Sequence, residues 1–312
     1  MIDDVTLPAD WADRVRAAVA DRPGLAGGTL TLLGAGLDSV AIRLDTPGGD
    51  AHVLRFPQHE EGAAGIAREA RLLPELAPRL PVPVPRFAFT APNPLGPGAF
   101  CCYPMVRGES LQPEEWHARG LLDEPETPRR IAAILDAVHM FPVEHARELG
   151  VQEWDLRASY TEDLVAVRAE LPRRLTARET AALIAAWEDH LADDANFVHL
   201  PTLIHADFSL DHLPVTGTRI SGLIDFGDTA IGDPDYDLAY LWDEAGPGLV
   251  RAVQACRGLP LTARQEAKLR FWALSELAND VLHAIEEDLP ALRDRSLAEL
   301  REHLSGEPAA PR

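Results

Sequence analysis

The chain carries the motif His205-Ala-Asp207-Phe-Ser-Leu-Asp211-His212, followed by Ile224-Asp225-Phe226-Gly227-Asp228 and then by Asp233-Pro-Asp235-Tyr-Asp237. Residues around 213–215 and 219–224 have the apolar, β-branched character of short strands, so the acidic motifs bracket one hairpin. A two-residue turn at 217–218 would pair Thr216 with Arg219 and place His212 opposite Leu223. Asp225 would then lie two residues further along the same face.

This hairpin register predicts a cation site. Diagonal neighbours on one face of a ladder lie about 7–8 Å apart, so the imidazole of His212 and the carboxylate of Asp225 can converge on one ion. Transfer of a γ-phosphoryl group to a hydroxyl needs such an Mg²⁺ site and a carboxylate that orients the hydroxyl. Asp207, on the loop that enters the hairpin, suits the second task. Aspartate is also common in turns and caps, but the ordered set of three motifs favours chemistry.

The first hundred residues are predicted to be mostly β with one helix. After a short amphipathic segment near 11–20, a helix with its apolar face at Ile66, Glu69 and Leu73 should end or kink at Pro74, because proline lacks an N–H. The strands are expected at Thr29–Leu33, Ser39–Leu44, His52–Phe56, Arg86–Thr90 and Ala99–Val106.

From residue 107 onward the periodicity is helical, with only the hairpin strands as β structure. The simplest architecture is an α+β fold of two lobes, a small β-rich lobe over 1–106 and a larger helical lobe over 107–312. Helices are expected at Thr127–His139, Ser159–Leu171, Arg178–Ala192, Pro234–Trp242, Gly248–Cys256 and Ala263–Ile285.

Two features of the small lobe suit a phosphate ligand. Main-chain N–H groups of the loop that carries Gly34, Gly36 and Ser39 could cover phosphates, although a glycine pair between strands is usually only a tight turn. Glu69 lies on an apolar helix face and needs a cation there. Arg55, at the end of the third strand, is the natural partner, and its guanidinium could also grip phosphates.

Composition narrows the partners. The chain has 29 basic and 50 acidic side chains and a net charge of −21, so it lacks the basic footprint of a nucleic-acid-binding protein. A cationic small molecule fits better. Three cysteines, two of them the adjacent pair Cys101 and Cys102, favour a reduced compartment. No leader at Met1–Asp4 and no membrane span are recognised, so a cytoplasmic location is expected.

With these motifs in place, the chain resembles the protein-kinase-like antibiotic phosphotransferases, most of all the aminoglycoside 2″-phosphotransferases, with the macrolide phosphotransferases second. The resemblance implies a protein-kinase-like fold with Asp207 as the catalytic base and an Mg²⁺ ion held by His212 and Asp225. It also implies that GTP or ATP is the phosphoryl donor and that the antibiotic is inactivated. The nucleotide would be bound by Gly34, Gly36, Ser39, Arg55 and Glu69, and by Tyr103 and Met105, where the strand Ala99–Val106 enters the hinge.

Two positions depart from the family pattern. Arg55 stands where most members have a lysine. In this respect the chain resembles related macrolide kinases, which use arginine there. Ala206 stands between the histidine and the base, where the family commonly has a polar residue.

The acceptor is expected to lie between the base and the helices that follow Asp237. Carboxylates beside an aromatic ring suit the ammonium groups and sugar faces of an aminoglycoside, although a solvated helix face is the alternative reading. His139, His145 and His199 lack ligand spacing and are expected to be structural or exposed. The acceptor-binding candidates are Asp243, Glu244, Trp272, Glu276 and Asp280.

The motifs favour an aminoglycoside kinase most. Its expected partners are a small-molecule antibiotic and a nucleotide, with no nucleic acid and no membrane, and it is expected to act as a monomer or homodimer. Three alternatives stay open beside this reading. The first is a macrolide phosphotransferase. The second is a hydrolase in which His205, Asp207 and His212 form a two-histidine, one-carboxylate metal centre. The third is a catalytically silent, kinase-shaped binding protein, which the presence of both Asp207 and Asp225 disfavours.

Overall fold

The computed structural model describes residues 7–36 and 38–305, and the chain packs into two compact units. Unit 1 contains residues up to Ser110 together with Glu144–Val151 and His212–Thr229, and unit 2 contains the rest. Both units are therefore discontinuous along the chain, and the division into 1–106 and 107–312 stays a prediction. The expectations for Met1–Asp4 and for Leu37 of the glycine loop lie outside the described residues.

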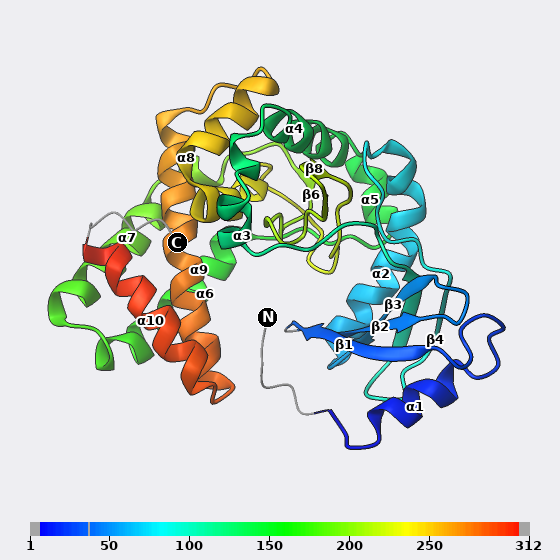
Figure 1. Cartoon of the computed structure of the whole chain (residues 1–312). Helices are drawn as coiled ribbons and strands as arrows, with labels where there is room; N and C mark the ends of the chain where they lie inside the picture. The colour runs from blue at the N-terminus through cyan, green and yellow to red at the C-terminus, as the bar shows by residue number, and fades with distance from the viewer. Residues whose placement is uncertain (1–6, 37, 306–312) are drawn as a thin grey trace. The chain divides into compact units, whose positions relative to one another are not determined.

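Unit 1 is built on a five-stranded antiparallel sheet with the strand order β1-β2-β3-β5-β4 (Figure 1). All five strands predicted in the first hundred residues are confirmed, with ends that differ by a few residues. The turn at Thr46–Asp50 joins β2 to β3. The strands are β1 (Thr29–Ala35), β2 (Ser39–Asp45), β3 (Ala51–Pro57), β4 (Phe89–Pro92) and β5 (Ala99–Pro104).

The sheet is covered on both faces, because alternate side chains of β3 enter different cores. Leu54 and Phe56 pack in a cluster that also contains Val15 of α1 (Trp11–Ala18). Val53 packs with Ile66 of α2 (Glu60–Leu76) in a second cluster. Two covered faces explain why β3 is nearly continuously buried.

Helix α2 ends at Leu76, so the end predicted at Pro74 lies two residues too early. Proline removes one N–H from the helical ladder and its ring crowds the carbonyl four residues earlier, which agrees with a helix that ends soon after it. A 3₁₀ turn, Ala77–Arg79, follows directly.

The short helix α5 (Val143–Glu148) also belongs largely to unit 1.

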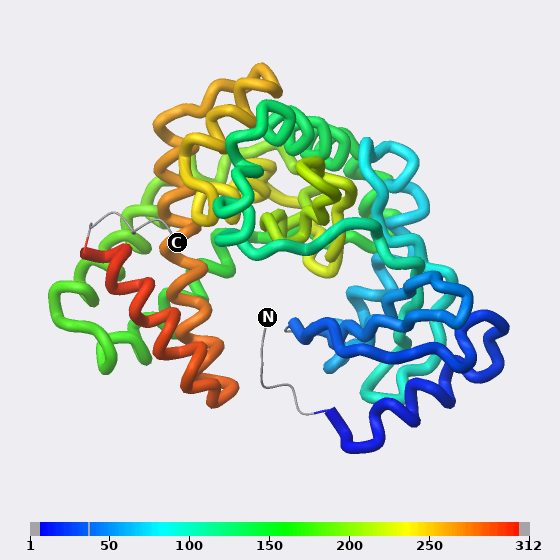
Figure 2. Tube along the Cα trace, in the orientation of Figure 1, coloured from blue at the N-terminus to red at the C-terminus, as the bar shows by residue number. Residues whose placement is uncertain are grey.

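Unit 2 is mainly helical, and α9 and α10 run side by side as the orange and red tubes of Figure 2. The predicted break between Trp242 and Gly248 is a kink inside α8 at Gly246, whose φ is 76°, directly before Pro247. The helices are α3 (Pro113–Ala118), α4 (Glu126–His139), α6 (Leu156–Glu170), α7 (Ala177–Ala192), α8 (Ala239–Cys256), α9 (Ala263–Glu286) and α10 (Pro290–Ser305).

Several elements differ from the predictions. A two-stranded sheet of β6 (Thr202–Ile204) and β9 (Ala230–Gly232) flanks the motifs, and α3, α5 and α10 were not expected. The predicted hairpin forms with Thr216 paired to Arg219, but β7 (Val215–Thr216) and β8 (Arg219–Ile220) are only two residues long. None of the described helices is long and apolar enough to cross a membrane.

Candidate active site

In unit 2, the segment after β6 presents one carboxylate from a buried stretch of backbone. From residue 203 to residue 210, every residue is buried except Asp207, which is partly exposed. The preceding residue, Ala206, has a φ of 68°, in the left-handed region that side chains other than glycine rarely adopt. This bend turns Asp207 out of the core while His205 and Phe208 stay fully buried.

Asp237 holds that bend. Its Oδ1 accepts a hydrogen bond from the amide of Ala206 at 2.8 Å, and its Oδ2 accepts one from the amide of His205 at 3.1 Å. His139 Nε2 lies 2.8 Å from the same Oδ2. Burial alone would raise the pKa of Asp237, but the hydrogen bond and charge of His139, with the amide of Ala206, hold this pKa below its usual range.

His139 is itself held by Arg257, the residue directly after α8. Arg257 donates from Nη2 to His139 Nδ1 at 2.9 Å and from Nε to Asp136 Oδ1 at 2.7 Å. His139 is therefore structural, as expected. Its Nδ1 faces the Arg257 donor and its Nε2 faces the Asp237 carboxylate. No local spacing could have revealed this group, because 98 residues separate His139 from Asp237.

Glu244, predicted to contact the acceptor, binds the backbone of the loop that carries Asp207. Its Oε2 accepts a hydrogen bond from the amide of Leu210 at 2.8 Å, and its carbonyl oxygen lies 3.2 Å from His117 Nε2. Trp116 donates to the carbonyl of Leu210 at 3.1 Å. Both polar groups of the Leu210 backbone are thus bound by side chains that anchor the loop.

Trp272 also differs from its predicted role as an acceptor-binding ring. Only 1% of its surface is exposed, and its ring lies 5.1 Å from that of Tyr236, centroid to centroid. Lys268 Nζ lies 4.9 Å from the centroid of the Trp272 ring. An aromatic ring on an amphipathic helix is read equally well as core or as binding surface, and here it is core.

Glu276, one of the predicted carboxylates of α9, interacts electrostatically with Asp207 and with Asp280 of the same helix. Tyr236 donates a hydrogen bond to Glu276 Oε1 at 2.7 Å. Burial raises the pKa of Glu276 to about 7; the Tyr236 hydrogen bond opposes this rise, and the charges of Asp280 and Asp207 add to it. Asp280 and Asp243 are exposed. The negative charges of Asp207 and Asp280 therefore both act on Glu276.

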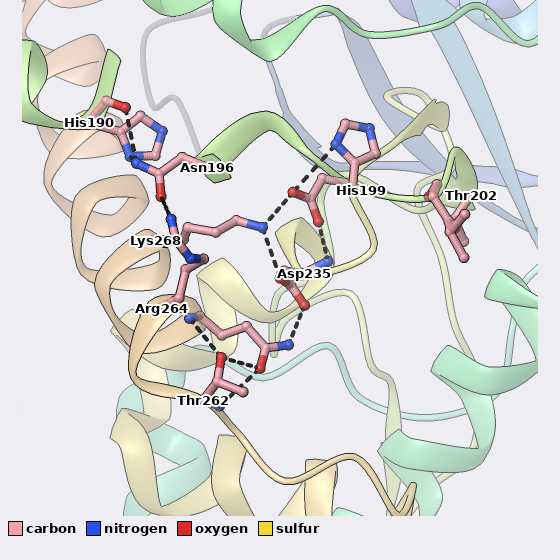
Figure 3. Close-up of polar contacts among 11 residues, drawn as sticks. His190, Asn196, His199, Thr202, Asp235, Thr262, Arg264 and Lys268 are labelled. Atoms are coloured by element: carbon pink, nitrogen blue, oxygen red, sulfur yellow. Dashed lines mark hydrogen bonds and ion pairs between the residues drawn. The ribbon is translucent and has the colours of Figure 1, made fainter. Parts of the chain in front are cut away.

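The motif Asp233–Asp237 is tied to α9 through the only lysine of the chain (Figure 3). Lys268 Nζ lies 2.5 Å from Asp233 Oδ2 and 2.8 Å from Asp235 Oδ2, and Gln265 donates to Asp235 Oδ1 at 2.8 Å. His199 Nδ1 lies 3.7 Å from Asp233 Oδ2. Asp233 and Asp235 thus have a structural role, because both pair with Lys268.

In unit 1, the predicted ion pair between Arg55 and Glu69 is confirmed. Arg55 Nη1 donates to Glu69 Oε1 at 3.0 Å and to Oε2 at 2.9 Å, and both side chains are almost completely buried. Burial raises the pKa of Glu69 to about 7, although the charge of Arg55 opposes this rise. Arg55 also reaches Asp225, with Nη2 at 3.1 Å from Oδ1.

His212 and Asp225 converge as the hairpin register predicted, but not along a regular ladder. His212 Nε2 lies 3.9 Å from Asp225 Oδ2. Beyond the two paired residues of each strand, the amide of Ile224 bonds the carbonyl of His212 at 3.0 Å, and Asp225 has a φ of 62°. Arg68 of α2 donates to the carbonyl of Gly227, which holds the chain that follows Asp225.

The pair of His212 and Asp225 fits a cation such as Mg²⁺, because an imidazole nitrogen and a carboxylate oxygen face each other and Mg²⁺ usually keeps several waters. Within the described residues, no group of three His, Cys, Asp or Glu side chains gathers as a metal site. The predicted alternative centre of His205, Asp207 and His212 is therefore not formed there, and His205 packs edge-on against Phe208 instead.

The glycine loop of unit 1 is anchored to the end of β3. The amide of Gly36 donates to the carbonyl of Ser39 at 3.0 Å, and Gln58 Nε2 donates to the carbonyl of Gly36 at 2.8 Å. Ser39 Oγ accepts from Arg55 Nε at 3.4 Å. Gly34 lies within β1 beside an irregularity in its pairing with β2, so it belongs to the strand rather than to the turn.

Tyr103 and Met105 stand where β5 leaves the sheet. Tyr103 is buried, with its ring stacked 5.7 Å from Phe87, and it belongs to the same apolar cluster as Val53. The amide of Met105 donates to the carbonyl of Ala51 at 2.9 Å, and its side chain is half-buried against this cluster. The cluster has the apolar character that a nucleotide base requires.

A family model described as the phosphotransferase enzyme family matches residues 29–272, more than half of the chain. This chain belongs to that family. The resemblance inferred from the acidic motifs is thereby confirmed. The matched range includes the sheet, the three acidic motifs and α9 up to Trp272.

Among relatives of this family member, an aminoglycoside 3′-phosphotransferase of Escherichia coli is 31% identical over 154 residues, which are 46% of this chain and 53% of the relative. The match thus spans about half of that protein. The GDP and kanamycin complex of APH(2″)-IIIa has a TM-score of 0.85 at 24% identity and covers 96% of this chain and 100% of its own.

Macrolide 2′-phosphotransferase type I is also similar, with a TM-score of 0.72 at 22% identity, and it covers 95% of this chain and 99% of its own. Matches at these identities show a shared fold. The predicted α+β, protein-kinase-like fold is therefore confirmed.

Proposed function

We propose that this chain transfers the γ-phosphoryl group of GTP or ATP to a hydroxyl of an aminoglycoside, with the 2″-hydroxyl as the expected acceptor. The observation that carries the proposal is Asp207, the one partly exposed side chain in an otherwise buried stretch whose backbone is fixed by Asp237 and Glu244. Similarity to an aminoglycoside 3′-phosphotransferase and to APH(2″)-IIIa, described with GDP and kanamycin, supports this acceptor class.

In this reaction Asp207 orients the acceptor hydroxyl and accepts its proton. The hydroxyl oxygen forms a bond to the γ-phosphorus, and the bond from that phosphorus to the β,γ-bridging oxygen breaks. Asp225 and His212 would hold Mg²⁺, which compensates phosphate charge when bound. The loop of Gly34, Gly36 and Ser39 is proposed to cover the phosphates.

The negative charge of the α9 carboxylates supports the proposal that the acceptor is a polycation. Glu276 and Asp280 lie on α9, and the charge of Asp207 acts on Glu276. Ammonium groups lower the repulsion among such carboxylates, so an aminoglycoside gains more from this surface than a macrolide with about one amine does.

The test is a product-release assay with ATP and with GTP against panels of aminoglycosides and macrolides, followed by NMR location of the new phosphate. Phosphorylated aminoglycoside that disappears with Asp207→Asn supports the proposal. Macrolide products alone would overturn the acceptor and leave phosphoryl transfer standing. Ligand binding without product from either panel would favour the silent binding protein.

A further inference from the structure

Arg55 has each of its three guanidinium nitrogens on a different protein group. Nη1 binds both oxygens of Glu69, Nη2 binds Asp225 Oδ1 at 3.1 Å, and Nε lies 3.4 Å from Ser39 Oγ. The residue is only 6% exposed, so water competes little for these contacts. A planar guanidinium offers its donors in fixed directions, which a lysine ammonium cannot reproduce.

The two oxygens of Asp225 consequently face different neighbours. Oδ1 contacts Arg55, while Oδ2 lies 3.9 Å from His212 Nε2. The Asp225 side chain is 41% exposed, in contrast to the buried guanidinium behind it. Its carboxylate is thus held by Arg55 from the inside of the unit, and part of the side chain is accessible to solvent.

We propose that Arg55 is a positioning residue that assigns these oxygens: Oδ1 is kept by the guanidinium, and Oδ2, on the side of His212, is the oxygen that binds the divalent cation. This inference rests on the cation site of the proposed function. It also gives the replacement of lysine by arginine a role, because one guanidinium fork binds Glu69 and Asp225 through separate nitrogens.

A consequence is weak binding of a divalent cation before the nucleotide arrives. Arg55 places a positive charge next to the carboxylate that must bind the cation, and like charges this close repel.

The test variant must remove the guanidinium without leaving Glu69 unpaired, since an unpaired buried carboxylate destabilises a fold. It is therefore the double change Arg55→Met with Glu69→Met.

The experiment titrates the full chain, without nucleotide, with Mn²⁺ and measures free ion by electron paramagnetic resonance. We expect the double variant to bind Mn²⁺ roughly fivefold tighter than the wild type. The matched variant Glu69→Gln keeps Arg55 on Asp225 and should bind no tighter than the wild type. Asp225→Asn should abolish the binding in both backgrounds, and nitrogen coupling to the bound Mn²⁺ should vanish in His212→Ala.

A folded double variant, verified by circular dichroism and its melting temperature, that binds Mn²⁺ as weakly as the wild type would overturn the proposal. Equal tightening in Glu69→Gln would do the same. Neither outcome depends on phosphoryl transfer, so an inactive chain with the expected Mn²⁺ pattern would refute the proposed function and leave the role of Arg55 intact.

Discussion

Single residues create the bends that present Asp207 and Asp225, the two carboxylates proposed to act in phosphoryl transfer. Ala206 and Asp225 both have positive φ, at 68° and 62°. A residue with a side chain loses about 1–2 kcal/mol in this region, so other contacts must offset the strain. At Ala206 the offset is the Asp237 carboxylate, and at Asp225 it is the Arg55 guanidinium.

Asp207→Asn should reduce kcat by about 10²–10⁴-fold, because the change removes the proton acceptor and keeps the shape of the side chain. Nucleotide affinity and melting temperature should stay close to those of the wild type. Steady-state kinetics with calorimetric nucleotide titration checks this.

Asp211→Asn is the matched control on the same loop, since Asp211 accepts a hydrogen bond from Ser209 Oγ at 2.6 Å and has no proposed role in proton transfer. It should retain most of kcat. If Asp207→Asn retained more than about a third of the wild-type kcat, the assignment of the base would be wrong.

Glu276→Gln should make the free energy of unfolding less dependent on pH. The pKa of Glu276 is raised to about 7 in the folded chain, above the value near 4.3 of an unfolded glutamate. The proton therefore stabilises the folded state fully below pH of about 4.3, and this contribution is lost as pH rises through about 7. Denaturant unfolding at about pH 5 and about pH 8 measures the difference.

Glu286→Gln serves as the control, because Glu286 lies on the same helix with its side chain exposed. Its variant should show the pH dependence of the wild type. A Glu276→Gln variant whose stability changed with pH as much as that of the wild type would contradict the effect of burial on this carboxyl.

At the scale of elements, α9 contributes to both the core and the site. Its Trp272 packs in the interior, while Glu276 binds the hydroxyl of Tyr236 and Lys268 binds the motif that precedes this tyrosine. One helix thereby holds the start and the middle of Asp233–Asp237. The end of the motif, Asp237, is held from α4.

Lys268→Met should destabilise unit 2 by about 3–5 kcal/mol, because it leaves Asp233 and Asp235 without their shared cation in a buried position. The side chains of Lys268 and Asp233 are only 5% and 1% exposed. Chemical denaturation followed by tryptophan fluorescence measures the loss.

The double change Lys268→Met with Asp233→Asn should recover part of the stability, since it removes the buried charge together with its partner. Arg270→Met, on the same helix with an exposed ion pair to Glu266, should change stability by less than about 1 kcal/mol. Equal losses in the Lys268 and Arg270 variants would show that burial of the pair does not matter.

For the whole molecule, we expect net charge to influence the encounter with the proposed acceptor. With −21 overall, the chain attracts a polycation, and this attraction is screened over about 8 Å at physiological ionic strength. We expect KM for an aminoglycoside to rise several-fold between low and high salt, with a smaller change in kcat. Initial rates across a salt series, with the nucleotide saturating, check this.

The KM for nucleotide measured in the same salt series is the control for general effects on the enzyme. An aminoglycoside KM that stayed constant, or rose only as much as the nucleotide KM, would argue against electrostatic recognition of the acceptor. A macrolide substrate whose KM stayed constant across the same salt series would agree with electrostatic recognition of the polycation.

Much of unit 1 could be read from the amino acids alone. Alternation of apolar residues, turn residues at Thr46–Asp50 and the isolated Glu69 are local signals, and they predict the strands and the pairing of Glu69 with Arg55. The register of the Gly217 turn likewise brings His212 near Asp225, because a two-residue turn sets the pairing on both sides of it.

Other features depend on contacts between residues far apart in the chain. The hydrogen bond from the amide of Ala206 to Asp237 and the one from Arg257 to His139 join separate elements, and no periodicity in the sequence encodes them. Burial of Trp272 and the use of Glu244 on the loop were likewise decided by packing. A helix face is amphipathic whether it meets a ligand or another helix, so only the packed chain determines which of the two it meets.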